Sequence, residues 1–481
     1  MNMQRFVCRR LPCAIHRLHQ DVPKRFHLSF ATQRPSPLLP STKDEARIPR
    51  RNEELCERLS PLADLWGLPN HLMSLQNDDP EYHHGLSFLS KDQLASVLSL
   101  PFPDDKTGWE ETASIRNGLY TAANLLTTQQ FGDKVHYRGL LEFSNICRND
   151  CNYCGIRKSF KVPNRYKLDE ATILQVAHWS AGRQYGSIML QSGEVVTPQR
   201  LRFLCKVIRR IVKETGLGVS LSVGELPDDY YEKLRQAGAK RYLLRIETSN
   251  PTLFAQLHPP EQTFEARLDR LRALERADFM VGTGIMIGLP GQTTLDLADD
   301  LLFFQRESVD MIGMGPYILQ RGTPTADDWI KEHPDLSRAL VAKEMGEASP
   351  GQIELLDVQA ARMFELTTRM VALSRLLLGD VNIAATTALQ TIHPTGREVA
   401  LMRGANILMP ILTPTDHRAH YQLYEEDASG LLDDPTTNGS FLVEIFTFFL
   451  KENKWPENMF AQTGKILLVR MSSDYPWDLK D

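Results

Sequence analysis

Apolar segments of strand length alternate with longer amphipathic segments from residue 136 to about residue 410. Strand-like segments occur at 138–145, 187–191, 218–223, 241–247, 281–287, 310–316, 381–387 and 405–410. Helical patterns separate them at 169–184, 198–215, 227–238, 263–276, 293–307, 359–377 and 395–402. Strands that alternate with helices form a parallel sheet, and eight such units close into a barrel. We therefore predict an α/β fold with a complete (β/α)8 barrel of the TIM type.

The remaining segments divide the chain around this barrel. Residues 46–130 carry helical patterns and are expected to form an N-terminal helical extension on the outside or at one end of the barrel, which spans 131–430. Within the barrel, residues 320–358 are rich in charge, Pro and Gly, which is typical of a surface insertion. Residues 431–481 form a short C-terminal extension, with one apolar helix expected at 440–451.

Several predicted strands carry a polar face instead of the apolar one that usually fills a barrel. Alternate positions share a face of a strand, and the apolar set must meet the helices. The polar set must then face the lumen, and it includes Arg138, Glu142, Ser144, Ser220, Ser222, Arg241, Arg245 and Glu247. Buried arginines are costly unless they meet anions or acids. The lumen is therefore predicted to be a ligand cavity. The alternative is an internal salt-bridge network in which Arg245 pairs with Glu247 or Glu142.

The first 45 residues differ in composition from the rest. Residues 1–43 contain one acid, Asp21, against eight basic residues, which are Arg5, Arg9, Arg10, Arg17, Lys24, Arg25, Arg34 and Lys43. Such an Arg-rich, acid-poor segment without an apolar core is typical of an organelle transit peptide. We expect targeting to a mitochondrion or a mitochondrion-derived organelle such as a hydrogenosome, and less readily to a plastid. The alternative is a disordered basic tail.

The overall composition argues against nucleic acid as the main partner and against a membrane-spanning helix. The chain has 481 residues, of which 42% are hydrophobic, and a net charge of −5. This charge argues against nucleic acid as the main partner. Because no run of 18 apolar residues occurs, no membrane-spanning helix is expected either.

Three of the seven cysteines fall within eight residues, directly after the first predicted strand: Cys147, Cys151 and Cys154. The loops that follow barrel strands form the catalytic face of such folds. Zinc would need a fourth ligand, and neither His136 nor His178 is well placed to supply it. Three thiolates suit a 4Fe–4S cluster with one iron open to a small molecule.

The spacing C-x3-C-x-aromatic-C, with Tyr153 before the last cysteine, resembles the radical S-adenosylmethionine (SAM) superfamily. This resemblance places the barrel in the radical SAM class and implies SAM as a second cofactor, cleaved to a 5′-deoxyadenosyl radical. Ser192, Gly193 and Glu194 resemble the superfamily's Gly-Gly-Glu element, with Ser in place of the first Gly, although a simple turn is the alternative. Residues 288–291 resemble the segment that passes the adenine.

Longer segments resemble the HydE-type maturases of iron-only hydrogenases. They lie at 138–158, 190–194, 245–251, 282–290, 384–388, 396–398, 403–410 and 421–424. The resemblance covers roughly residues 50–450 without the insertion. It distinguishes the chain from biotin synthase and methylornithine synthase, which share the barrel. It implies an enzyme that helps build the hydrogenase active-site cluster.

The same resemblance implies roles for individual residues. The expected SAM contacts are Tyr153, Ser192, Gly193, Glu194, Glu247, Arg267, Met311, Met409 and Tyr421. The expected substrate pocket comprises Arg138, Ser220, Arg241, Arg245, Thr386 and Thr387. The implied substrate is a small anionic complex, an iron dicarbonyl cyanide bound to cysteine. The implied protein partners are a reductant of the ferredoxin or flavodoxin type and other maturation proteins.

The cysteine count limits the alternatives. No cysteine follows Cys205, so the second, C-terminal cluster of many family members cannot form, and one cluster is expected. Biotin synthase needs further cysteine ligands inside its barrel, whereas only Cys56 and Cys205 remain here, and Cys205 lies on the apolar face of a helix. A non-catalytic iron–sulfur carrier would leave the polar lumen unexplained.

Overall fold

The computed structural model describes residues 48–67, 86, 89–132, 134–161, 164–421 and 423. The predicted transit peptide at 1–45 and the C-terminal extension with its helix at 440–451 lie outside the described residues. The described residues belong to one compact unit, Ser41–Asp481. None of its described helices is both long enough and apolar enough to cross a membrane.

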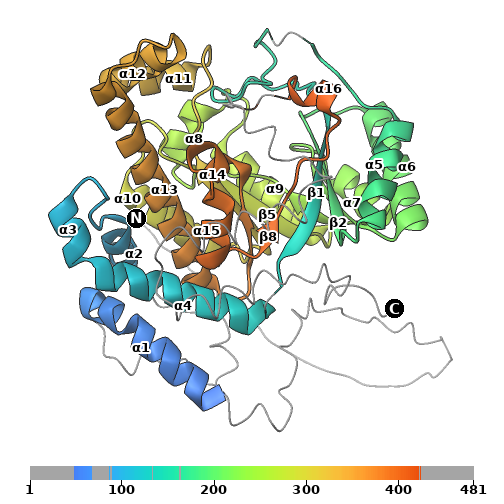
Figure 1. Cartoon of the computed structure of the whole chain (residues 1–481). Helices are drawn as coiled ribbons and strands as arrows, with labels where there is room; N and C mark the ends of the chain where they lie inside the picture. Colours follow the sequence, from blue (N-terminus) through green and yellow to red (C-terminus); the bar gives the residue numbers. More distant parts are fainter. Residues whose placement is uncertain are drawn as a thin grey trace, which may run out of the picture. The chain divides into compact units, whose positions relative to one another are not determined.

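Eight parallel strands form a closed barrel in sequence order, β1 to β8 (Figure 1). The prediction of a complete (β/α)8 barrel is confirmed. The strands are β1 (His136–Ser144), β2 (Ser187–Ser192), β3 (Gly218–Ser222), β4 (Ala239–Leu243), β5 (Met280–Ile287), β6 (Met311–Pro316), β7 (Asn382–Ala385) and β8 (Ile407–Leu408).

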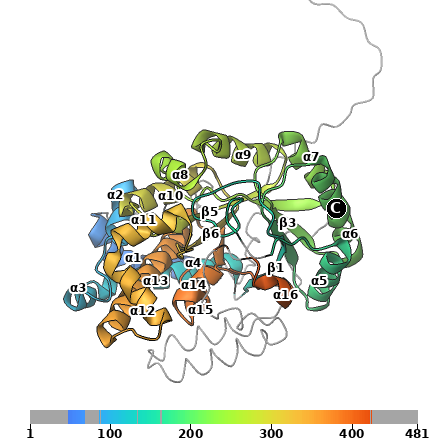
Figure 2. The ribbon, with the colours of Figure 1, turned by 90° about the horizontal axis from the view of Figure 1, so that it is seen from above.

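Helices surround this barrel on its outside when it is seen from above (Figure 2). One helix follows each of the first three strands and β5, and two or more follow β4, β6 and β7. They are α5 (Glu170–Gly182), α6 (Pro198–Thr215), α7 (Asp228–Gln236), α8 (Pro251–Leu257), α9 (Phe264–Arg276), α10 (Thr294–Arg306), α11 (Pro324–Glu332), α12 (Pro334–Glu344), α13 (Pro350–Leu378), α14 (Thr387–Ile392) and α15 (Gly396–Met402). A short helix, α16 (Thr415–Arg418), follows β8.

Four helices precede the barrel: α1 (Ile48–Trp66), α2 (Lys91–Leu98), α3 (Lys106–Glu111) and α4 (Ala113–Phe131). Helix α4 crosses beneath the amino-terminal ends of the strands (Figures 1 and 2). The buried carboxylate of Glu365, on α13, connects α4 to the barrel. It accepts a hydrogen bond from the hydroxyl of Tyr120, on α4, at 2.5 Å. The same carboxylate pairs with Arg403 at 2.9 Å and with Arg369 at 3.2 Å. The N-terminal helices are therefore an integral part of the fold.

The predicted insertion at 320–358 is mostly helical. It contains α11, α12 and the first turns of α13, which begins nine residues before the predicted 359. A capping box explains the early start: the Ser349 side chain accepts from the backbone of Gln352, whose own side chain accepts from Ser349, and Pro350 occupies the first helical turn. This segment exposes an apolar side chain, Met345, with 67% of its surface accessible.

The strands alternate as their sequence patterns predict. Leu141 and Phe143 are fully buried in the apolar core shared with the surrounding helices. Arg138, on the other face of β1, is 1% exposed and contacts Met311 of β6 across the lumen. Cys205 of α6 is buried in the core, as its apolar helix face predicts. Polar side chains thus fill the interior of the barrel, and apolar side chains hold the helices to its outside.

Candidate active site

The three clustered cysteines lie on the loop that leaves the carboxyl end of β1. Each thiol is partly exposed and forms no disulfide. Backbone hydrogen bonds hold this loop to distant parts of the chain. Asn152 N donates to Leu257 O at 2.7 Å, and Gly155 N donates to Leu423 O at 3.0 Å. The loop is therefore fixed from α8 and from the segment after β8.

The side chain of Arg165 stabilises the same loop through hydrogen bonds to its backbone. Its guanidinium donates to four backbone carbonyls, those of Asn145 at 2.6 Å, Ile156 at 2.8 Å, Arg157 at 2.6 Å and Phe160 at 3.1 Å. These carbonyls lie on both sides of the cysteine run, so one side chain fixes both ends. Sequence analysis missed this residue, because nothing in the sequence relates an arginine eleven positions after Cys154 to the loop's own carbonyls.

Gly193 allows the loop to approach β2 closely. A Cβ at this position would lie 2.4 Å from the carbonyl oxygen of Ile146 and 2.7 Å from the Cβ of Cys147, closer than real atoms pack. Arg148 N donates to Glu194 O at 2.9 Å beside this contact. The Ser192–Glu194 element and the cysteine loop are therefore assembled as one unit, as their predicted shared role requires.

The chemistry of the donor set fits an iron–sulfur cluster. Burial raises the pKa of Cys147 and Cys151, and it raises the pKa of Cys154 to about 12. Such thiols hold their protons until a metal displaces them. Among the described residues no three His, Cys, Asp or Glu side chains are arranged around one ion. A 4Fe–4S cluster takes each thiolate on a separate iron, so three thiols on one loop suit it.

Glu194 is held rigidly at the carboxyl end of β2. The side chain is 5% exposed, and its Oε1 pairs with Arg148 Nε at 2.7 Å. Its Oε2 accepts from the backbone N–H of Glu225 at 2.6 Å. Ser192 accepts a hydrogen bond from Arg200 at 3.0 Å through its hydroxyl. The predicted SAM-binding element thus presents a buried carboxylate next to the cysteine loop.

A second carboxylate, Glu247, faces the same end of the lumen. Its backbone has φ of +66°, a left-handed conformation that costs free energy for a residue with a side chain. Backbone pairing with β5 nevertheless continues here, because Glu247 N donates to Gly284 O and Met286 N donates to Glu247 O. The Tyr153 hydroxyl lies 3.4 Å from Glu247 Oε1. Backbone strain at one residue therefore positions a carboxylate beside the cysteine loop.

Arg245 pairs with this carboxylate, and Arg267 lies next to Arg245. Arg245 Nε donates to both Glu247 oxygens, at 2.9 and 3.0 Å, and its other nitrogens donate to Gly313 O and Ile285 O. Arg267 donates to the carboxylate of Glu225 and to the carbonyl of Arg245. The structure thus contains the Arg245–Glu247 pair considered as an alternative. It places Arg245 with the predicted SAM contacts at the carboxyl end.

Other predicted residues lie around the same end. Tyr421 is 7% exposed, and burial raises the pKa of its hydroxyl well above the usual range. Thr386 precedes α14 and donates to Met314 O at 2.9 Å, and Thr387 is the first residue of that helix. Both threonines therefore follow the carboxyl end of β7, away from Arg138 and Arg241.

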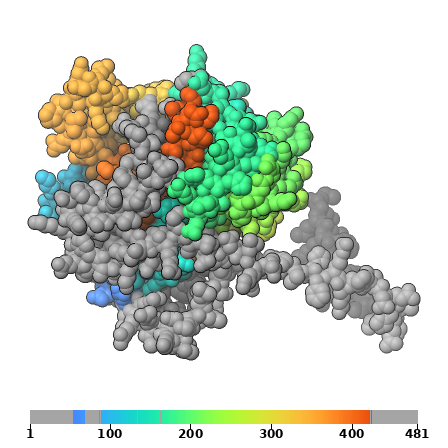
Figure 3. Space-filling view, turned by 45° about the vertical axis from the view of Figure 1, so that its right-hand side comes forward, coloured from blue at the N-terminus to red at the C-terminus, as the bar shows by residue number. Residues whose placement is uncertain are grey.

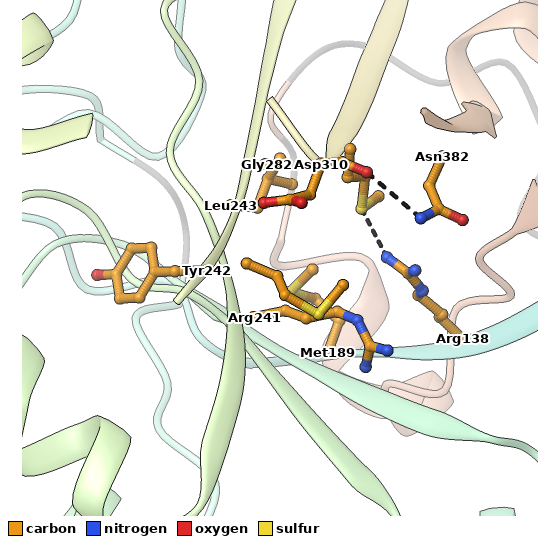
Figure 4. Close-up of a pocket in the computed structure, with 10 residues that line it drawn as sticks. Arg138, Met189, Arg241, Tyr242, Leu243, Gly282, Asp310 and Asn382 are labelled. Carbon is orange, nitrogen blue, oxygen red and sulfur yellow. Dashed lines mark hydrogen bonds between the residues drawn. The ribbon is translucent and has the colours of Figure 1, made fainter. Parts of the chain in front are cut away.

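A separate small pocket lies at the amino ends of the strands, with a volume of about 10 Å³ (Figure 4). The Arg138 guanidinium lies 2.7 Å from the Met311 sulfur, and the Asn382 amide donates to the Asp310 carbonyl at 3.3 Å. The cavity is lined by Arg138, Met189, Arg241, Tyr242, Leu243, Met280, Gly282, Asp310, Met311 and Asn382. It therefore combines two guanidinium groups and three thioethers with a single carboxylate.

Further predicted residues border this cavity. Ser220 pairs in register with Arg241, and its fully buried hydroxyl has no hydrogen-bond partner among the described residues. Met311 lines the cavity, and Met409 packs on the cluster that Met311 forms with Ala384 and Ile407. The structure thus groups both methionines with predicted substrate-pocket residues, whereas the sequence analysis expected them beside SAM.

Comparisons with known proteins agree with this geometry. The family model described as the Radical SAM superfamily matches residues 141–304, which include the cysteine loop, Glu194 and Glu247. The chain is 41% identical over 306 residues to the [FeFe] hydrogenase maturase subunit HydE of Thermotoga maritima, covering 64% of this chain and 78% of that protein. It is 26% identical over 255 residues to 3-methylornithine synthase of Methanosarcina acetivorans, covering 53% and 68%.

Solved structures share the fold. The crystal structure of the methylornithine synthase PylB has a TM-score of 0.56 and 22% sequence identity, and the match covers 78% of this chain and 96% of that one. At this level of identity the likeness concerns the barrel alone.

Proposed function

Because the chain belongs to the HydE family of hydrogenase maturases within the radical SAM superfamily, we propose that it acts in building the active-site cluster of an [FeFe] hydrogenase. The proposed substrate is a small anionic iron complex with carbonyl, cyanide and cysteine ligands. The observation that carries the proposal is the division of the lumen into two ends. Cysteines and buried carboxylates lie at one end, and the arginine-lined cavity lies at the other.

The carboxyl end supplies the cofactor site. Cys147, Cys151 and Cys154 would hold a 4Fe–4S cluster, which would supply the electron for reductive cleavage of SAM. Glu194 and Glu247 offer buried carboxylates to the cationic and hydroxyl groups of SAM. Arg245 and Arg267 hold these acids and their neighbours in place, so that little rearrangement is needed on binding.

The amino end suits the proposed substrate. Guanidinium groups bind carboxylate and cyanide groups through charge-assisted hydrogen bonds, and here Arg138 and Arg241 supply them. The thioethers of Met189, Met280 and Met311 are soft and apolar, which suits carbonyl ligands. Such a cavity excludes water from a reactive complex.

A maturation assay tests the proposal. An anaerobic mixture that lacks its HydE component would receive the cluster-loaded protein, and hydrogenase activity would be measured with and without SAM. We expect activity that depends on both, and none with Cys154→Ala. A protein that binds its cluster and cleaves SAM but yields no hydrogenase activity would contradict the proposed substrate while leaving the radical chemistry intact.

We also propose that residues 1–45 direct the protein to a mitochondrion or a hydrogenosome. The support is the ratio of eight basic residues to one acid in residues 1–43. Fusion of residues 1–45 to a fluorescent protein in a eukaryotic cell should give organelle labelling. The same fusion with the arginines changed to glutamine should remain in the cytosol. Diffuse fluorescence from both fusions would contradict the proposal.

A further inference from the structure

A strongly basic surface lies over the cysteine loop of an otherwise acidic protein. Residues 148–167 contain six basic residues and one acid, whereas the whole chain has a net charge of −5. The six are Arg148, Arg157, Lys158, Lys161, Arg165 and Lys167. The local excess of positive charge is therefore a property of this segment and not of the protein's average composition.

Three of these six basic side chains bind carboxylates or backbone carbonyls of the protein itself. Arg148 pairs with Glu194, Arg157 pairs with Asp150 at 2.6 Å, and Arg165 binds four carbonyls of the loop. The other half consists of three exposed lysines, Lys158, Lys161 and Lys167, which we call the lysine collar. Within the described part of the chain no carboxylate lies within ion-pair distance of any of them. The Lys167 ammonium lies over the ring of Phe203 at 4.5 Å.

Neighbouring elements extend this surface. Tyr166, between the collar lysines, stacks on His417 of α16 with ring centroids 4.7 Å apart. In the space-filling view a red-orange surface, the colour of the described residues that follow β8, lies beside a teal surface, the colour of the segment that follows β1 (Figure 3). Ile146, next to Cys147, leaves 41% of its surface exposed. A basic rim around a small apolar contact suits a transient encounter with an acidic protein.

We propose that the lysine collar docks an acidic, low-potential one-electron carrier protein, with its redox centre directed at the cysteine loop. The inference rests on the proposed function, because only a radical SAM enzyme needs this electron. One electron leaves the carrier's reduced centre, which is oxidised, and enters the cluster held by the loop, which is reduced. No bond forms or breaks in this step. Because electron transfer slows steeply with distance, the carrier must dock where the cluster is nearest the surface.

The position and the charge of the collar lysines both favour an acidic electron carrier as the docked protein. Lys158 and Lys161 lie only four and seven residues after Cys154, and Lys158 N donates to Asn149 O within the loop. The hydrogen bond from Lys158 to Asn149 places this lysine beside the cysteine loop, so a partner that contacts it is near the loop. Long-range attraction between opposite charges raises the rate of encounter, and salt screens it. The proposed docking predicts an electron-transfer rate that falls as ionic strength rises.

The test compares two triple variants with the same net charge. Lys158→Glu/Lys161→Glu/Lys167→Glu reverses the collar, and Lys106→Glu/Lys134→Glu/Lys213→Glu reverses three exposed lysines away from the loop. Each cluster-loaded full chain would be mixed anaerobically with a reduced, acidic plant-type [2Fe–2S] ferredoxin. The rate of cluster reduction would be followed by stopped-flow absorbance, and ferredoxin affinity would be measured separately by calorimetry. Dithionite reduction would serve as the reference for an intact cluster.

We expect the collar variant to accept electrons from ferredoxin at least about tenfold more slowly at low salt, and to bind it correspondingly more weakly. Its reduction by dithionite should be unchanged, and the control variant should match the wild type in all three measurements. Equal rates and affinities for the two variants, or a wild-type rate independent of salt, would overturn the proposal. These readouts require no maturation substrate, so a failed maturation assay would leave them interpretable.

Discussion

The two ends of the barrel lumen are both polar, but they differ in which charged groups line them and in how these groups are paired. At the carboxyl end, arginines that are themselves partly or largely exposed neutralise buried acids, as in the pairs Arg148–Glu194 and Arg245–Glu247. At the amino end, Arg138 and Arg241 share a cavity wall with one carboxylate, Asp310, which accepts a hydrogen bond from Val281 N. The first end thus consists of acid–arginine pairs, whereas the second is lined by two guanidinium groups, one carboxylate and three thioethers.

This difference indicates how one barrel can separate two tasks. A balanced site keeps its geometry whether or not a ligand is present, which suits the positioning of a cofactor. A site lined by guanidinium groups offers donors for charge-assisted hydrogen bonds, which suits capture of an anionic substrate. Mutations at the two ends should therefore have separable effects.

The largest effect is expected from Cys154→Ala, which should abolish the function of the carboxyl end. Two thiolates cannot hold the cluster, so bound iron and sulfide should fall to background and SAM cleavage should cease. Iron analysis, electron paramagnetic resonance and chromatography of 5′-deoxyadenosine would measure this. Cys205→Ala, in the helix core, is the control and should retain both. Continued SAM cleavage by Cys154→Ala would contradict the role of the loop.

The next largest effect is expected from Arg241→Leu, which acts at the amino end alone. Loss of a charge-assisted hydrogen bond of roughly 1.5–3 kcal/mol should lower hydrogenase maturation by about ten- to a hundredfold. Cluster content and SAM cleavage should stay at wild-type levels. Arg245→Leu should impair SAM cleavage as well, because Arg245 holds Glu247. If Arg241→Leu matured hydrogenase normally, the amino-end cavity would not be the substrate site.

A smaller effect is expected from Arg165→Met, which loosens the cysteine loop without removing a ligand. Four carbonyls lose their donor, so the loop should open more often and release iron to a chelator roughly tenfold faster, as for a loss of about 1.4 kcal/mol. Absorbance of the released iron complex would report this rate. Arg202→Met, at an exposed position of α6, is the matched control. An unchanged release rate would show that the backbone bonds suffice.

The last prediction concerns stability alone, with no expected change at either end of the lumen, and it centres on Asp300, which supports the segment carrying Glu247. Its Oδ1 accepts from Ser249 N at 2.5 Å, and burial raises its pKa to about 7. The folded protein thus holds a proton that the unfolded chain releases above about pH 4, so stability falls as pH rises towards 7. Between pH 5 and pH 8 the free energy of unfolding should decrease by roughly 3 kcal/mol from this group.

Asp300→Asn removes this titration while keeping an acceptor for Ser249. Its urea unfolding should therefore show a flatter dependence on pH than the wild type. Asp335→Asn, exposed on α12, should follow the wild-type curve. Parallel curves for wild type and Asp300→Asn would mean that Asp300 is ionised in the folded protein.

The sequence predicted the barrel and its polar interior because both follow from periodicity. Strand alternation alone placed Arg138 inward, and spacing alone singled out the cysteine loop. Boundaries were harder to predict where local signals compete with composition. The sequence contains the Ser349 capping box that starts α13, but the charge and Gly content around it indicated a surface insertion, so the predicted helix began too late.

Other features have no local signal in a single sequence. The bonds from Arg165 to four carbonyls depend on how the loop folds back on itself. The left-handed backbone of Glu247 arises from continued pairing with β5. The family resemblance predicted which residues belong to the site but not where in the lumen each one lies. The register of the strands shows that they divide between its two ends.

The close approach at Gly193 has a consequence for engineering. A methyl group there would meet the Ile146 carbonyl oxygen at 2.4 Å, and the loop that carries Cys147 would have to move. Ser192, one residue earlier, has room for its hydroxyl and a partner in Arg200. A mutagenesis library for altered cofactor use can therefore test small residues at position 192, whereas it should keep glycine at position 193.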